Sequence, residues 1–235
     1  MFLPLHDGVP LQHVTAPAAT RLVIGLCVLA YPLTFFGPLG ADWVVAGFGL
    51  IPAVFFGTEA LPEGLPFVPA WATVVTSIFL HGSWIHLLGN MLFLWVFGDN
   101  VEDAMGHVRF LCFVLLCGAA AGLAHAFADP ESARPLIGAS GAVSGIVAAY
   151  LILYPRVRMW ALFLHGIPLR VPAYWAIGFW FGLQLGSAFM SGDENVGWFA
   201  HLGGFVAGAL LTTPMRRRYD PVLARIEAQG LRPTP

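Results

Sequence analysis

The segment Asn195–Leu211 reads NVGWFAHLGGFVAGALL, and its small residues decide how the chain packs. His201, Gly204 and Gly208 follow the spacing i, i+3 and i+7, which places them on one face of a helix. Gly204 and Gly208 form a GxxxG pattern, and such a face lets a second backbone come very near. The segment therefore predicts an apolar helix, about Trp198–Thr213, that carries a histidine beside a close helix contact.

The composition of the whole chain is that of a membrane protein. Of 235 residues, 58% are hydrophobic and only 10% are charged, whereas soluble domains carry about a quarter charged residues. The apolar content excludes a disordered chain, and the net charge of −2 offers no basic surface for nucleic acid. Six apolar runs approach or reach the length that crosses a bilayer: about Leu22–Phe36, Trp71–Phe97, Phe110–Phe127, Gly138–Tyr154, Val171–Met190 and Trp198–Thr213. We therefore expect an all-α membrane protein with six transmembrane helices.

The arginines predict how this bundle is oriented, because the chain has no lysine. With a cytoplasmic N-terminus, ten of the eleven arginines fall inside and only Arg134 falls outside, a strong positive-inside bias. Both termini, residues 1–21 and 215–235, are then cytoplasmic, and residues 22–214 form the membrane domain. The outer first loop, residues 37–70, contains the short apolar stretch Trp43–Gly57, which we interpret as interfacial or re-entrant.

A second face of small residues fits the one around His201. It lies in the segment PLIGASGAVSGIVAAYLILYP, residues 135–155, and consists of Gly141, Gly145 and Ala148. Ser140, between Gly138 and Gly141, opens this short helix, so we expect it below the headgroups, where unpaired backbone N–H groups favour developing negative charge. Packing of the two faces would bring the His201 ring within reach of Ser140.

The second apolar run, TSIFLHGSWIHLLGNMLFLWVFG, contains three further polar side chains. His86 and Asn90 are four residues apart and share one helix face. His81 lies five residues before His86, about 140° away around a continuous helix, so we expect it to make a hydrogen bond between helices instead. Polar groups inside a span are costly and mark functional sites by default.

Together these side chains suit nucleophilic catalysis. A serine becomes a nucleophile when a histidine accepts its proton, and acyl transfer then needs donors for the oxyanion. His86, Asn90 and the Ser140 N–H could supply those donors. No acidic residue lies in a predicted span near His201, so we expect a Ser–His dyad, and no HExxH motif or embedded carboxylate favours a metal site. The predicted reaction is peptide-bond hydrolysis within the membrane, without a cofactor.

The chain resembles the rhomboid family of intramembrane serine proteases from about Trp71 to Leu211. The resemblance rests on four motifs in order along the chain: HGSWIHLLGN, GDNVEDAMG, GASGAVSG and AHLGGFVAG. It implies that Ser140 is the nucleophile, that His201 is the general base, and that His86 and Asn90 bind the oxyanion. It further implies structural roles for the remaining motif residues, His81, Glu102 and Gly106.

The resemblance also implies the architecture and the substrates. It indicates a six-helix bundle whose water-filled cavity opens to the outer side. The absence of lysine and the high alanine and glycine content point to the cell membrane of a prokaryote. Substrates would be single-span membrane proteins that reach the site laterally, past an aromatic fifth helix carrying Trp175, Phe179 and Trp180. This sequence departs from the family pattern at Ala72, where many members have Arg, and at Ser144, where some have an aromatic residue.

Two other functions stay open. A rhomboid-like pseudoprotease would bind membrane proteins without cleaving them, and would have lost Ser140, His201 or the oxyanion donors. A transporter could use the intramembrane histidines as a proton relay, but it predicts inverted repeats and embedded carboxylates, which the sequence lacks. The sequence indicates neither the physiological substrate nor the oligomeric state.

Overall fold

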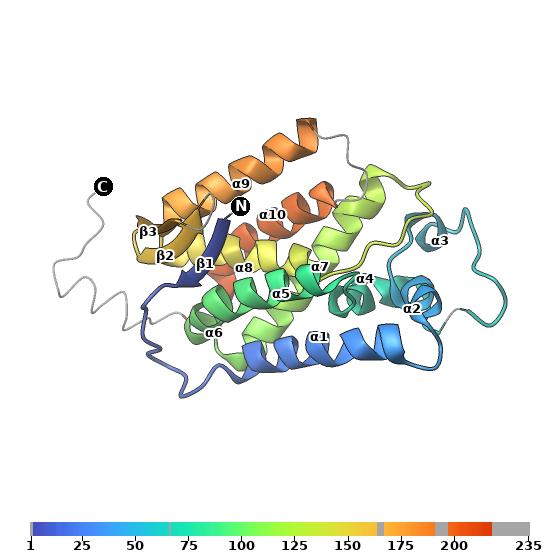
Figure 1. The fold of residues 1–235 in the computed structure, drawn as a ribbon, viewed down its shortest axis with the longest axis horizontal. Coiled ribbons are helices and arrows are strands. Elements are labelled where there is room, and N and C mark those ends of the chain that lie inside the picture. The colour runs from blue at the N-terminus through green and yellow to red at the C-terminus, as the bar shows by residue number, and fades with distance from the viewer. Residues whose placement is uncertain (1, 66, 164–166, 191–196, 218–235) are drawn as a thin grey trace.

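The computed structural model describes residues 2–65, 67–163, 167–190 and 197–217, which form a helical bundle with a small sheet at one end (Figure 1). The longer helices are α1 (Ala18–Phe36), α5 (Trp84–Phe93), α7 (His107–Ala128), α8 (Ser140–Leu153), α9 (Ala173–Met190) and α10 (Trp198–Met215). The shorter ones are α2 (Ala41–Phe48), α3 (Pro52–Phe55), α4 (Thr73–Thr76) and α6 (Asp99–Met105). Single turns at Ala70–Ala72 and Ser77–Phe79 flank α4, and a π-helical turn, Leu94–Gly98, joins α5 to α6.

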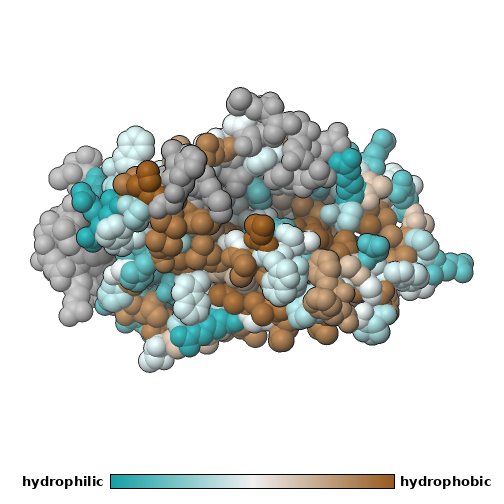
Figure 2. Space-filling view, viewed as in Figure 1, coloured by the Kyte–Doolittle hydropathy of each residue, from teal (hydrophilic) through white to brown (hydrophobic). Residues whose placement is uncertain are grey.

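The outer surface of the helices is apolar, as a protein in lipid requires. On α1, Leu22, Leu29 and Leu33 are at least half exposed. Figure 2 shows hydrophobic residues gathered across the middle of one face, with hydrophilic residues toward its two ends. Among the described residues, α1 and α7 are long and apolar enough to cross a membrane, and a bent pair, 70–79 with 84–105, adds a third candidate. The six-span count therefore stays a prediction.

The second predicted span is not one continuous helix. Its two halves, Ala70–Phe79 and Trp84–Met105, meet at an angle of 82°. The break lies at residues 80–83, where the Ser83 side chain caps α5 by accepting a hydrogen bond from the His86 N–H (3.2 Å). The expected 140° separation of His81 and His86 is wrong, because His81 precedes the helix and its ring centre lies 5.1 Å from that of His86.

A three-stranded antiparallel sheet corrects the all-α fold class to a mostly helical one. Its strands are β1 (Phe2–His6), β2 (Arg158–Phe163) and β3 (Ile167–Pro172), in the order β1–β2–β3. Met159 and Ala161 alternate with more exposed neighbours and are fully buried, which is the two-residue period of a strand with one face on the core. The hairpin occupies most of the link between two predicted spans, and β1 pairs with it from far along the chain.

The first loop is anchored by backbone bonds rather than by residue 72. Leu50 and Leu136 exchange both backbone hydrogen bonds, at 3.1 and 2.8 Å, and Leu50 is fully buried. The Ala53 N–H donates to the Ser132 carbonyl at 3.0 Å. The loop helices α2 and α3 are thereby tied to the chain just before α8, at the end of the bundle away from the sheet (Figure 1).

Glycine contacts hold α8 against α10 at the centre of the bundle. A Cβ added at Gly204 would overlap the Gly141 carbonyl oxygen, and one at Gly208 would overlap the Gly145 carbonyl. The helix α7 packs on both, with Cys117 against Gly145. No side chain separates the two backbones at these positions, so the two small-residue faces lie directly on each other.

We expect Gly204→Ala to destabilise the protein through this contact. Forcing an extra methyl into a packed interface costs about 1–3 kcal/mol, and each kcal/mol lowers Tm by roughly 2–4 °C in a chain of this size. The measurement is thermal unfolding in detergent. Gly25→Ala on α1 is the matched control, because an added Cβ there meets nothing within 4 Å and should leave Tm equal or slightly higher. Equal Tm values for the two variants would contradict the packing described here.

Candidate active site

Ser140 and His201 meet where α8 crosses α10. Ser140 is the first residue of α8 and His201 lies in the first turn of α10, one turn before Gly204. The Ser140 Oγ and the His201 Nε2 are 2.9 Å apart, which is hydrogen-bonding distance. Gly141 and Gly204 adjoin this pair and set the helix separation that permits it. Both residues are half-buried, so the pair is partly shielded from solvent but still accessible.

The His201 ring has few polar neighbours. Within the part of the chain that the structure describes, its Nδ1 is buried and has no hydrogen-bond partner. Trp198, one turn earlier on α10, presents its ring at 6.0 Å and 89° to the imidazole. The sequence analysis did not single out Trp198, although its i, i+3 spacing from His201 was the signal available. Among the described residues, the Trp198 ring and no carboxylate adjoins the base of this serine–histidine pair.

His86 faces the loop that leads into Ser140. A Cβ added at Gly138 would lie 2.7 Å from the His86 ring, so the imidazole packs directly on the glycine backbone. Gly138 also has φ +123°, a conformation that side-chain-bearing residues rarely adopt. Its N–H donates to the Ser77 carbonyl at 2.9 Å, which fixes the loop on the preceding segment. His86 thus packs on a residue, Gly138, that precedes Ser140 by two positions in the chain.

Asn90 lies one turn beyond His86 on α5 and is 7% exposed. Its Nδ2 donates to the His86 carbonyl at 3.1 Å, which holds the amide along the helix. Among the residues that the structure describes, Asn90 bonds to His86 and makes no hydrogen bond to Ser140. His81 is fully buried beside His86, and its Nδ1 lies 3.2 Å from the carbonyl of Phe79, two residues earlier. Within the described part of the chain, this local contact replaces the hydrogen bond between helices that we expected.

The first turn of α8 supplies a second kind of polar group. The amides that open a helix have no carbonyl within that helix to bond, and they carry partial positive charge. Ser144, one turn later, donates its hydroxyl hydrogen bond to the Ser140 carbonyl at 2.9 Å. Residue 144 of this chain therefore presents a hydroxyl that is bonded to the backbone of its own helix.

Glu102 and Gly106 lie away from this site, near the sheet end of the bundle. Glu102 is fully buried and accepts hydrogen bonds from the backbone N–H groups of Ala19 and Thr20, at 2.9 and 2.7 Å. The His107 Nδ1 contacts the same carboxylate at Oε1. Gly106 has φ +85° and ends α6. Glu102 thus contacts the first turn of α1, and a Cβ added at Gly106 would lie 3.0 Å from the Arg217 side chain.

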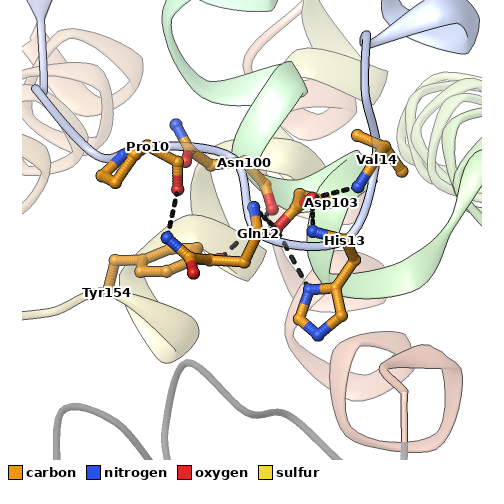
Figure 3. Close-up of polar contacts among 7 residues, drawn as sticks. All are labelled: Pro10, Gln12, His13, Val14, Asn100, Asp103 and Tyr154. Carbon is orange, nitrogen blue, oxygen red and sulfur yellow. Dashed lines mark hydrogen bonds and ion pairs between the residues drawn. The ribbon is translucent and has the colours of Figure 1, made fainter.

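The next carboxylate on α6 binds the chain before α1. Asp103 accepts from the backbone N–H groups of Gln12, His13 and Val14 at 2.7–2.9 Å (Figure 3). These bonds hold the Asp103 side chain on the turn. The GDNVEDAMG motif thus provides acceptors for an N-terminal segment that the sequence analysis treated as a short tail.

Comparison with known proteins identifies the family of this chain. The family model of the Rhomboid domain matches residues 69–218. RHOMBOID-like protein 5 of Arabidopsis thaliana is 28% identical over 59% of this chain and 42% of its own length. Rhomboid protein 1, mitochondrial, of Saccharomyces cerevisiae is 28% identical over 76% and 55%. Rhomboid protease AarA of Providencia stuartii is 26% identical over 82% and 70%.

The chain spans about half the length of the first two of these relatives. The matched region nevertheless runs from just before α4 to the end of α10 and includes all four motifs noted above. Because the family model covers more than half of the chain, the expected relationship is confirmed, and the chain belongs to the rhomboid family.

Proposed function

We propose that the chain is an intramembrane serine endopeptidase that cleaves membrane proteins in or near their transmembrane segments. The observation that carries the proposal is the 2.9 Å distance between the Ser140 Oγ and the His201 Nε2, at a helix crossing built from glycines. Membership of the rhomboid family supports the same reaction.

In this reaction His201 is the general base. With its proton on Nδ1, the imidazole accepts the Ser140 hydroxyl proton at Nε2, and Oγ attacks the carbonyl carbon of the scissile bond. The imidazolium then donates that proton to the leaving amine, and the peptide C–N bond breaks. Water, activated by the same Nε2, hydrolyses the acyl-enzyme and regenerates Ser140. Each step transfers one proton to or from the His201 Nε2, so a serine–histidine dyad is sufficient.

The oxyanion that forms in each step needs hydrogen-bond donors. His86 is the first candidate, because its ring packs on Gly138 two residues before the nucleophile. The second Nδ2 hydrogen of Asn90 and the Ser140 N–H at the start of α8 complete the proposed set. In a site shielded from water such donors act at low dielectric, where each is worth more than in solution.

We further propose the membrane arrangement from the charges. Ten arginines on one side and Arg134 on the other support cytoplasmic termini and an active site open to the extracytoplasmic side. The relatives named above include mitochondrial and bacterial proteins and do not decide the membrane. A prokaryotic cell membrane is proposed on composition, from the absence of lysine and the 27 glycines. Single-span proteins are the proposed substrates.

A fluorophosphonate probe should label the wild-type protein and fail to label Ser140→Ala. The reason is that phosphonylation needs a serine whose proton a base accepts, so His201→Ala should also lose labelling. Ser144→Ala is the matched control, one turn along the same helix, and it should label like wild type. Equal labelling of Ser140→Ala and wild type would remove Ser140 from the mechanism. A folded wild-type protein that takes no label would favour the pseudoprotease.

Asn90→Ala should lower kcat by about 10-fold or more while leaving the protein folded, because an oxyanion donor acts only in the transition state. The measurement is cleavage of a single-span reporter, with Tm recorded in parallel. Asn100→Ala on α6 is the control amide and should lower Tm without lowering kcat. An Asn90→Ala protein with reduced yield and unchanged kcat would show that Asn90 is structural.

A further inference from the structure

A buried aspartate far from the proposed active site ties the N-terminal strand to two helices. Asp7 directly follows β1 and is 9% exposed. Its Oδ2 accepts hydrogen bonds from the Tyr150 hydroxyl and the Asn100 amide, each at 2.7 Å. Burial raises the pKa of Asp7, and the bond from Tyr150 opposes this shift. Since a buried carboxylate needs such donors, residue 7 is fixed on α8 and α6 together.

The chain after Asp7 is held in the same way. Its turn at residues 12–14 donates three backbone hydrogen bonds to Asp103, as Figure 3 shows. The start of α1 donates two more to Glu102. Hydrogen bonds to Asn100, Asp103 and Glu102 of α6 therefore hold the segment from Asp7 to Thr20 against this helix.

The strand before Asp7 connects this segment to α9. Leu3 pairs with Leu162 of β2, and Pro4 pairs with Ala161. At the other end of the hairpin, the first amides of α9 bond to the chain that leads into β2. The Ala173 N–H donates to the Val157 carbonyl at 2.8 Å, and the Tyr174 N–H donates to the Pro155 carbonyl at 3.0 Å. Asp7, β1, β2 and the start of α9 thus form one continuous hydrogen-bonded path.

Over the residues whose side chains the structure describes, the rest of α9 is packed less extensively than its neighbours. It contacts α8 and α10 only sparsely, whereas α7, α8 and α10 pack tightly on one another. Aromatic pairs make some of these contacts: Trp180 lies 5.5 Å from Phe93, and Phe181 lies 4.2 Å from Phe205, between ring centres. Trp175 is 66% exposed. The hydrogen-bonded start of α9 is therefore an important constraint on its position.

We propose that Asp7 is a positioning residue that restrains α9 and thereby limits lateral access of transmembrane substrates to Ser140. This inference rests on the proposed function. Without its carboxylate, β1 loses its polar attachment to α6 and α8, the sheet gains freedom, and α9 separates from α5 more often. The fraction of molecules open to substrate rises, so the apparent KM falls while the chemical step is unchanged.

The test compares Asp7→Ala with wild type in proteoliposomes that contain a single-span reporter. We expect KM to fall about threefold or more, with kcat and the rate of fluorophosphonate labelling unchanged. Asp7→Asn keeps an oxygen that can accept from Tyr150 and Asn100, so it should restore the wild-type KM. Val23→Ala, a cavity in the buried face of α1, controls for general destabilisation and should leave KM unchanged.

An unchanged KM in folded Asp7→Ala would overturn the proposal, as would a parallel loss of kcat and labelling. If Asp7→Ala does not fold, Tyr150→Phe removes one bond of the same carboxylate and should show the same change. A second readout does not need protease activity. Spin labels at Leu88→Cys and Leu183→Cys, in a Cys112→Ser background, report the separation of α5 and α9.

The distance distribution between these labels should broaden toward longer values in Asp7→Ala and stay as in wild type in Val23→Ala. An unchanged distribution would overturn the role of Asp7 whether or not the protein cleaves the reporter. A wild-type protein that neither takes the probe nor cleaves the reporter would instead overturn the proposed function alone.

Discussion

The contact between Gly204 on α10 and Gly141 on α8 is the constraint on which the rest of the site depends. The hydrophobic effect does not drive helices together within lipid, so close packing of their backbones stabilises the bundle. Here that packing also fixes chemistry, because Ser140 immediately precedes one glycine and His201 lies one turn before the other. A bulkier residue at either glycine would separate the hydroxyl from the imidazole as well as loosen the bundle.

The two ends of the bundle hold different segments of the chain in place. At the loop end, backbone bonds between Leu50 and Leu136 tie α2 and α3 to the chain that enters α8. At the sheet end, the carboxylates of α6 bind the N-terminal segment, and Asp7 of that segment accepts from Asn100 and Tyr150. The strand β1 connects the same segment, through β2, to the start of α9. The core helices between them are packed by glycine, whereas α9 depends on its attached end.

Much of this site could be predicted from local sequence, because its parts follow helical spacing. The glycine faces on either side of Ser140 and His201 predicted their proximity, and the structure places the two atoms 2.9 Å apart. The neighbouring His81 and His86 rings could not be predicted from a continuous helix. Ser83, three residues before His86, was the capping signal for a new helix start, and the apolar run around it masked that signal.

The sheet and the Asp7 cluster lay beyond such reasoning, because they join residues far apart in the chain. Asp7 and Tyr150 are 143 residues apart, and nothing near FLPLH indicates the strand with which it pairs. The central claim, that glycine packing sets the serine–histidine geometry, is tested most directly by the fluorophosphonate labelling rate of the folded fraction of Gly204→Ala. A displacement of about 1 Å should slow labelling by about 100-fold relative to Gly25→Ala; folded Gly204→Ala that labels at the rate of Gly25→Ala would contradict it.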